Sequence, residues 1–299
     1  MESELIIDAR ADLGEGPAWD AIASKLYWVD IHVGMLHCYD PLNGSDQPHH
    51  FDEPVGCVAP CNPTWKSPGG LSGNVVLALK SGLILYDQLR QDWNYLVQPE
   101  AHLPGNRFND GKCDPAGRFL AGTMDDAEIE ASGSLYSYSP NGTLKILLKG
   151  VRISNGLTWS MDGKTFYYID TPTHQVTAFD YNLSTGDIAN PRPVVTVPPE
   201  IGWPDGMTAD AEGMLWVAIW GGAKLTRWNP TTGKLLEVIP IPAMNVTACV
   251  FGGHDLTELY ITSARKGMST EQLAHYPLSG GLFRIQTNTR GLPTYGFGG

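Results

Sequence analysis

The chain has 299 residues, of which 42% are hydrophobic and 17% charged, and its formal net charge is −12. An acidic chain without a Lys/Arg cluster repels nucleic acid and anionic membrane surfaces, so we expect neither as a partner. No stretch approaches the roughly 20 apolar residues of a transmembrane helix, and the first residues do not resemble a secretory signal, so we expect a cytoplasmic protein.

Short strands are predicted along the whole chain, beginning with ELIIDAR at 4–10. Runs rich in aromatic and β-branched residues are typical of strands, and they recur as KLYWVDI (25–31), TFYYIDT (165–171), MLWVAIW (214–220) and ELYITSA (258–264). A further strand that ends at a turn follows each run, at 36–44, 176–186, 225–233 and 281–291. The turn sequences DPLNGS, YNLSTGD and NPTTGK indicate hairpins. A helical period appears only in a short segment at 269–275.

One phrase recurs through the chain, with a polar residue followed closely by Gly and an apolar residue four places after the first. It reads FNDGKCDPAG at 108–117, SNGLTWSMDG at 154–163 and PDGMTADAEG at 204–213. Weaker copies are LGEGPAWD (13–20), EPVGCVAP (53–60) and VTACVFGGHD (246–255). The matching positions, spaced 42 to 52 residues apart, are Glu15, Cys57, Asn109, Asn155, Asp205 and Thr247.

Repeats of this length, built from four short strands, are typical of a β-propeller blade. We therefore predict an all-β protein, a six-bladed β-propeller with four-stranded blades that forms a single domain over residues 1–299. The strand at 4–10 is expected to complete the last blade, because closing the ring removes exposed sheet edges. A two-domain β-sandwich is the competing interpretation.

In a propeller the innermost strands line a central channel, so the six matching positions should face one another. Glu15 and Asp205 offer carboxylates there, while Asn109 and Asn155 offer amide oxygens. This set suits a hard cation such as Ca²⁺, Mg²⁺ or Mn²⁺, and Zn²⁺ is compatible although the set contains no His. The alternative is ordinary turn chemistry, since Asn-Gly and Asp-Gly are common in turns. Glu15 favours the axial metal site, because it occupies the same position of the repeat although Glu is a poor turn residue.

Arg107 precedes Asn109 by two residues, so on a strand both side chains point to the same face. Its guanidinium could bind substrate hydroxyls or a carboxylate. The alternative role is a salt bridge to Asp110 or Asp125.

Five cysteines are irregularly spaced, and we expect them to be ordinary reduced thiols. A zinc site formed by Cys57, Cys61, His49 and His50 is the alternative, but the spacing does not fit a zinc knuckle.

Several long phrases closely resemble the regucalcin, or senescence marker protein, branch of the gluconolactonase family. They are RFNDGKCDPAGRFLAGTM (107–124), SNGLTWSMDGKTFYYID (154–170), PDGMTADAEGMLWVA (204–218) and CVFGGHDLTELYITSARKGM (249–268). The resemblance runs from end to end and implies a six-bladed propeller with one divalent metal ion in the channel. It implies the metal ligands Glu15, Asn155 and Asp205, and it places Arg107 and Asn109 at substrate-binding positions.

The chain departs from the family in two places. The family's substrate-facing Glu aligns with Ala127, so Asp126 or Glu128 would have to replace it, and we take Glu128 as the substrate-binding residue. The segment 58–70 is longer than in the family and is expected at a channel mouth. Both departures bear on which sugar is preferred.

The activity implied by the resemblance is divalent-metal-dependent hydrolysis of sugar lactones to aldonic acids, with the metal polarising the lactone carbonyl. Asp205 is the candidate catalytic general base. The expected partner is a small-molecule sugar lactone, and no obligate protein partner is indicated. The alternatives are a Ca²⁺-binding regulatory protein and a phosphotriesterase-like hydrolase that uses the same metal site.

Overall fold

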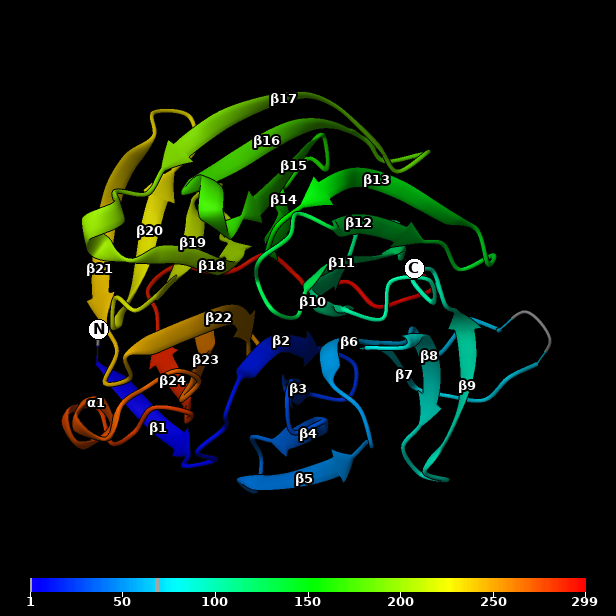
Figure 1. Ribbon diagram of the computed structural model, residues 1–299, viewed down its shortest axis with the longest axis horizontal. Helices are drawn as coiled ribbons and strands as arrows, with labels where there is room; N and C mark the ends of the chain where they lie inside the picture. Colours follow the sequence, from blue (N-terminus) through cyan, green and yellow to red (C-terminus); the bar gives the residue numbers. More distant parts are fainter. Residues whose placement is uncertain (1, 68–69) are drawn as a thin grey trace.

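The computed structural model describes residues 2–67 and 70–299 and confirms the six-bladed β-propeller. Six four-stranded antiparallel sheets surround a central axis (Figure 1). The strands of each blade are given from the innermost outward. Blade 1 consists of β2 (Gly14–Asp20), β3 (Lys25–Asp30), β4 (Met35–Asp40) and β5 (Ser45–His50), and blade 2 of β6 (Val55–Pro60), β7 (Val75–Leu79), β8 (Gly82–Asp87) and β9 (Asp92–Val97). Blade 3 consists of β10 (Asn106–Cys113), β11 (Phe119–Asp125), β12 (Gly133–Tyr138) and β13 (Leu144–Val151).

Blades 4 to 6 follow the same plan. Blade 4 consists of β14 (Ser154–Trp159), β15 (Thr165–Asp170), β16 (Gln175–Asn182) and β17 (Asp187–Thr196), and blade 5 of β18 (Trp203–Ala209), β19 (Leu215–Trp220), β20 (Lys224–Asn229) and β21 (Lys234–Pro240). Blade 6 consists of β22 (Asn245–Gly252), β23 (Glu258–Ala264), β24 (Leu282–Gln286) and β1 (Ser3–Ile7). Two 3₁₀ turns, η1 (Thr171–Thr173) and η2 (Pro199–Ile201), and the helix α1 (Thr270–His275) complete the described elements. The helix expected at 269–275 is confirmed, and Ser269 caps it in a capping box with Gln272.

Burial falls from the axis outward within each blade. Every residue of the innermost strands β6 and β14 is buried, whereas the outermost strand β9 is largely exposed. The apolar core lies between adjacent blades, as where Trp19 of blade 1 and Trp216 of blade 5 share a cluster with Phe251 of blade 6. The innermost strands are therefore held firmly, and this positions any side chain that points into the channel.

The predicted ring closure is confirmed. Strand β1 pairs antiparallel with β24, with Leu5 opposite Phe283, and becomes the outermost strand of blade 6. At the axis, Thr247 on β22 donates a hydrogen bond from Oγ1 to the carbonyl oxygen of Gly14 at 2.6 Å. The ring is thus closed by the chain passing from β1 in blade 6 to β2 in blade 1 and by this bond between the two innermost strands.

All six matching positions of the sequence repeat lie on the six innermost strands. In each of these strands the pairing register shifts within three residues of the matching position, at a β-bulge or irregularity. The glycine that follows the polar residue is required by close packing: a Cβ at Gly156 would lie 2.8 Å from the carbonyl oxygen of Asp205, and one at Gly206 would lie 2.5 Å from Cβ of Ala248. These glycines therefore belong to converging strands, and the alternative of simple Asn-Gly turns is wrong.

The end of the channel near the last residues of the innermost strands is crossed by the C-terminal segment, red in Figure 1. Tyr295 bridges to Cys113 at the end of β10, and Phe297 bridges to Cys61 just after β6. The prediction that segment 58–70 lies at a channel mouth is wrong for residues 60–62, since Pro60 and Asn62 hydrogen-bond to Phe297 at the closed end. Residues 68–69 of that segment lie outside the described residues.

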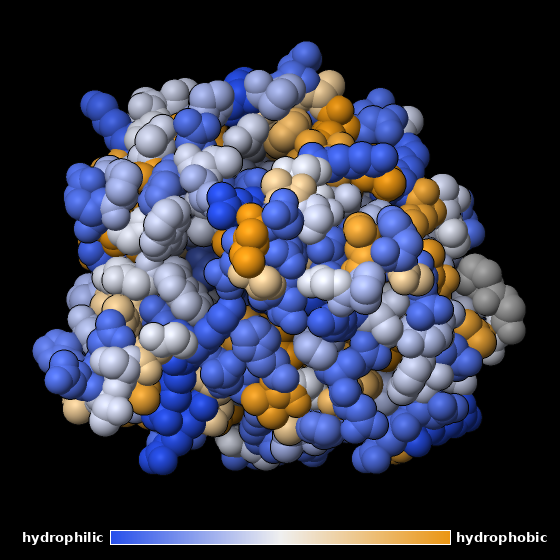
Figure 2. Space-filling view, in the orientation of Figure 1, coloured by the Kyte–Doolittle hydropathy of each residue, from blue (hydrophilic) through white to orange (hydrophobic). Residues whose placement is uncertain are grey.

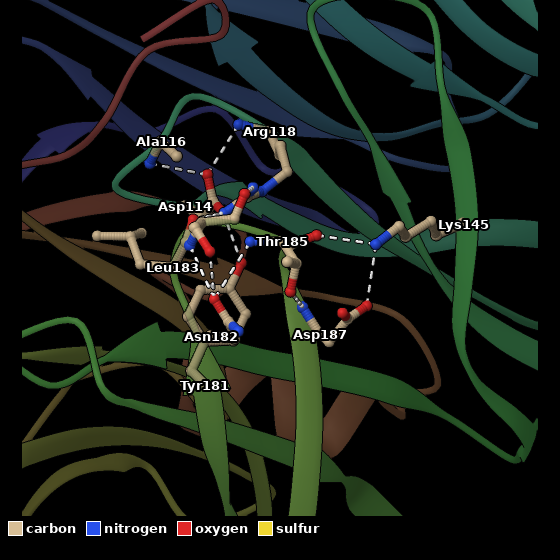
Figure 3. A network of polar contacts seen from close by, with 10 residues as sticks. Asp114, Ala116, Arg118, Lys145, Tyr181, Asn182, Leu183, Thr185 and Asp187 are labelled. Atoms are coloured by element: carbon tan, nitrogen blue, oxygen red, sulfur yellow. Dashed lines mark hydrogen bonds and ion pairs between the residues drawn. The ribbon is translucent and has the colours of Figure 1, made fainter.

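A polar network ties blade 3 to blade 4 at this same end (Figure 3). Asp114, which is fully buried, accepts bonds from Arg118 and from the hydroxyl of Tyr181. Arg118 in turn donates to the carbonyl oxygens of Leu183 and Ser184. The buried ion pair is thus shared between the two blades.

The face in Figure 2 is predominantly hydrophilic, with hydrophobic side chains scattered over it rather than gathered in one patch. Within the described ranges 2–67 and 70–299, no helix is long and apolar enough to cross a membrane.

Candidate metal centre and substrate cavity

A cavity of about 670 Å³ opens at the end of the channel where the innermost strands begin. It is bordered by residues at or just before the start of four of these strands, including Leu13, Ile153, Trp203 and Asn245. All the site residues predicted from the sequence line this one cavity: Glu15, Arg107, Asn109, Glu128, Asn155 and Asp205.

Two carboxylates face the cavity from opposite parts of the chain. Glu15 and Asp205 are both buried, each with about 4% of its surface exposed. Burial, together with the charge of nearby Asp110, raises the pKa of Glu15 to about 8. Burial and the charges of Glu15 and Asp110 raise the pKa of Asp205 well above its usual range. Three buried carboxyl groups therefore repel one another around the axis.

The donor set fits a divalent cation. Within the described residues, Oδ1 of Asp205 is buried and has no hydrogen-bond partner, which is costly for a polar atom. Glu15 accepts a bond from the backbone N–H of Gly16 through Oε2. A cation between these carboxylates would remove their mutual repulsion and satisfy the unpartnered oxygen. No three or more His, Cys, Asp or Glu side chains of the described residues gather as a metal site, so the set depends on Asn as well.

Asn155 joins the site through a chain of hydrogen bonds. Its Oδ1 accepts from Nδ2 of Asn109 at 2.9 Å, and its own Nδ2 donates to the hydroxyl of Thr171 at 2.8 Å. Thr171 donates onward to the carbonyl oxygen of Pro204, next to Asp205. This chain fixes the direction of the Asn155 amide, leaving Oδ1 able to offer a second lone pair.

Arg107 and Asn109 point to the same face of β10, as the two-residue spacing predicts. Nη1 of Arg107 donates to Oδ1 of Asn109 at 2.6 Å, and Nε donates to Asp126 at 2.8 Å. The alternative salt bridge to Asp110 or Asp125 is therefore wrong, because the partner is Asp126. Within the described part of the chain, Nη2 of Arg107 has no protein partner, although only 2% of the residue is exposed.

The loop between β11 and β12 decides which residue stands near the departure at Ala127. Ala127 is exposed, and Asp126 is held by Arg107 and Lys80 without lining the cavity. Glu128 lines the cavity and forms an ion pair with Lys266 at 2.5 Å. Of the two candidates, only Glu128 is placed at the cavity.

The sequence analysis missed several residues of the site. Lys112, whose charge lies near Asp110, donates from Nζ to the carbonyl oxygen of Met207 at 2.9 Å. Trp203 and Lys266 line the cavity mouth. Alternation from Arg107 and Asn109 predicts positions 111 and 113 on their face rather than Lys112. No repeat marks the mouth residues, because they stand in or beside loops.

The cysteine and histidine residues do not form the alternative zinc site. Cys57 is buried on the innermost strand β6, whereas His49 and His50 lie on the outermost strand β5 of the neighbouring blade. His49 is hydrogen-bonded through Nδ1 to the hydroxyl of Tyr86 at 3.0 Å. The five cysteines are free thiols, as expected.

Fold and cavity together define a six-bladed β-propeller with an oxygen-lined axial site. A family model described as the SMP-30/Gluconolactonase/LRE-like region matches residues 13–265. Regucalcin of Gallus gallus is 40% identical over 305 residues, covering 100% of this chain and 99% of the relative. A Bacillus subtilis (strain 168) protein, provisionally named sugar lactone lactonase YvrE, is 38% identical over 299 residues, with 100% and 99% covered.

The fold is also similar to a solved structure described as a calcium-binding protein, regucalcin, from Agrobacterium tumefaciens str. C58. The TM-score is 0.91 at 26% identity, with 99% of this chain and 97% of that chain covered. The chain belongs to the SMP-30/gluconolactonase/LRE-like family.

Proposed function

We propose that the protein hydrolyses sugar lactones to aldonic acids and that the reaction depends on one divalent metal ion. The observation that carries the proposal is the meeting, around one cavity, of polar residues from distant parts of the chain: Glu15, Arg107, Asn109, Glu128, Asn155 and Asp205. Family membership and the name of the Bacillus subtilis relative support a lactone as the substrate.

Glu15, Asn155 and Asp205 would hold the ion. Two carboxylates balance its charge, and the amide oxygen adds a neutral donor, a combination that suits Ca²⁺, Mg²⁺ or Mn²⁺ and is also accepted by Zn²⁺. An ion bound there supplies Lewis acidity that polarises the lactone carbonyl and stabilises the oxyanion.

Asp205 is suited to act as the general base. A carboxylate has two oxygens, so one can hold the ion while the other accepts a proton from water. As the water oxygen bonds to the carbonyl carbon, Asp205 takes a proton from that water. It returns the proton to the ring oxygen as the C–O bond of the lactone breaks, so the ring opens to a hydroxy acid.

Arg107, Asn109 and Glu128 would orient the ring. Nη2 of Arg107 can donate to a hydroxyl, and the carboxylate of Glu128 can accept from one. The amide atoms of Asn109 are already bonded to Arg107, Ser154 and Asn155, so it would also hold its neighbours in place.

The variant Arg107→Lys tests this proposal against a purely Ca²⁺-binding role. Lysine keeps the charge but loses the planar fork, so kcat/KM for D-glucono-δ-lactone should fall about 100-fold through lost orientation. Metal affinity, measured by titration calorimetry, should stay nearly unchanged, because Arg107 is not among the proposed ligands. Lactone turnover equal to that of the wild type would contradict the role of Arg107 in binding substrate.

A further inference from the structure

An ion pair spans the mouth of the cavity between two opposite blades. Glu128 lies in the loop that follows β11 of blade 3, and Lys266 lies in the loop that follows β23 of blade 6. Neighbouring blades follow one another in chain order around the ring, so blades 3 and 6 face each other across the axis. Nζ of Lys266 and Oε1 of Glu128 are 2.5 Å apart although 138 residues separate them in sequence.

Both ends of this pair rise from firmly held backbone. Glu128 has a positive φ of 62°, and the loop around it is fixed because Asp125 accepts hydrogen bonds from the N–H groups of Ile129 and Glu130. On the other side, the N–H of Lys266 donates to Asp12 and its carbonyl oxygen accepts from Asn245. The two side chains meet over the cavity because the loops place them there.

The surroundings of the pair differ from the floor of the cavity. Both residues line the cavity and remain partly exposed, at 43% for the Glu128 side chain and 28% for Lys266. The cavity wall includes the apolar residues Met124, Met244 and Trp203, and Arg152, which also lines the cavity, donates to the carbonyl oxygen of Glu128. A molecule bound at the axial carboxylates and reaching outward would therefore meet the ion pair of Lys266 and Glu128 at the mouth of the cavity.

We propose that Lys266, paired with Glu128, is a specificity-determining residue of the lactone site. The pair sterically excludes substrates with long substituents at the mouth of the cavity. Its ammonium and carboxylate groups can hydrogen-bond to the hydroxyls of a compact sugar ring. The inference rests on the proposed lactonase function and adds to it a residue and a size limit.

The test compares kcat/KM for D-glucono-δ-lactone with kcat/KM for a δ-lactone that carries a long alkyl chain. In Lys266→Ala and in Glu128→Ala the ion pair is lost. The ratio of kcat/KM for the alkyl lactone to kcat/KM for gluconolactone should therefore rise about tenfold, a discrimination of the size that pocket contacts provide. The double variant Glu128→Lys/Lys266→Glu restores a pair of opposite charges and should return the ratio close to that of the wild type. Lys145→Ala is the matched control, because Lys145 pairs with Asp187 outside the cavity and its loss should leave the ratio unchanged.

Three failures can be told apart. A wild-type protein that hydrolyses gluconolactone, with a ratio that Lys266→Ala does not move, would overturn the inference and leave the proposed function standing. A ratio that rises in both single variants but is not restored by the charge swap would overturn the pairing. A wild-type protein that hydrolyses neither lactone with any divalent ion would overturn the proposed function and the inference together. Circular dichroism checks folding, which the loss of a partly exposed pair should not disturb.

Discussion

Asn155 is held from two sides, and this explains how a neutral amide can serve as a well-aimed ligand. Asn109 donates to its Oδ1, and Thr171 accepts from its Nδ2. Partners behind a ligand orient it and thereby contribute to metal affinity. Asn109 therefore links the proposed metal ligand Asn155 to the proposed substrate-binding residue Arg107, from which it accepts a hydrogen bond.

Replacing Asn109 with Ala should weaken divalent metal binding by about 10- to 100-fold, because the amide of Asn155 loses the bond that directs it. Titration calorimetry with Ca²⁺ or Mn²⁺ measures the change. Asn43→Ala, in an exposed turn, is the control and should bind the ion as the wild type does. An unchanged affinity in Asn109→Ala would show that Asn109 does not orient the ligand.

Among the elements, the innermost strands are the ones that the sequence predicts best. Their repeated phrase marks Glu15, Asn109, Asn155 and Asp205, because each blade must bring a strand to the crowded axis in the same way. The pairing of Glu128 with Lys266 was not predictable, since neither loop belongs to the repeat and the two meet only when the ring closes. The segment 58–70 was misplaced for a similar reason: its position depends on the C-terminal segment that packs against it.

The contacts between neighbouring blades can be tested at the network of Asp114 (Figure 3). Tyr181→Phe removes a hydrogen bond to a buried carboxylate and should lower the free energy of unfolding by about 2 kcal/mol. Urea unfolding followed by tryptophan fluorescence measures this. Lys145→Ala, which removes an exposed pair from the same region, should leave the midpoint unchanged. Equal midpoints for Tyr181→Phe and wild type would contradict the role of the network in joining the blades.

At the scale of the whole molecule, closure of the ring brings acidic side chains together at the axis. Closing six blades brings Glu15, Asp110 and Asp205 together in a buried space, and burial raises the pKa of each. Lys112 is the cation near Asp110, and burial lowers the pKa of Lys112. Burial of these carboxyl groups therefore destabilises the metal-free protein, and a bound divalent ion would offset that destabilisation.

This gives a pH dependence with a definite sign. Between the ordinary pKa of Glu15 and its raised value of about 8, the native metal-free protein binds more protons than the unfolded chain, so its stability falls as pH rises. Ion binding requires ionised carboxylates, so stabilisation by the ion grows over the same window. The difference in Tm between protein with saturating Ca²⁺ and protein with chelator should be larger at about pH 9 than at about pH 5. A difference that is constant or shrinks with pH would contradict the axial site.

The most direct test of the central claim is acid release from D-glucono-δ-lactone, followed with a pH indicator after subtraction of spontaneous hydrolysis. Chelator-treated protein should be inactive, and adding Ca²⁺, Mg²⁺, Mn²⁺ or Zn²⁺ should restore turnover with at least one ion. Asp205→Ala should lose activity by about 10²- to 10⁴-fold even with that ion present. Full activity without a metal, or wild-type turnover in Asp205→Ala, would contradict the account.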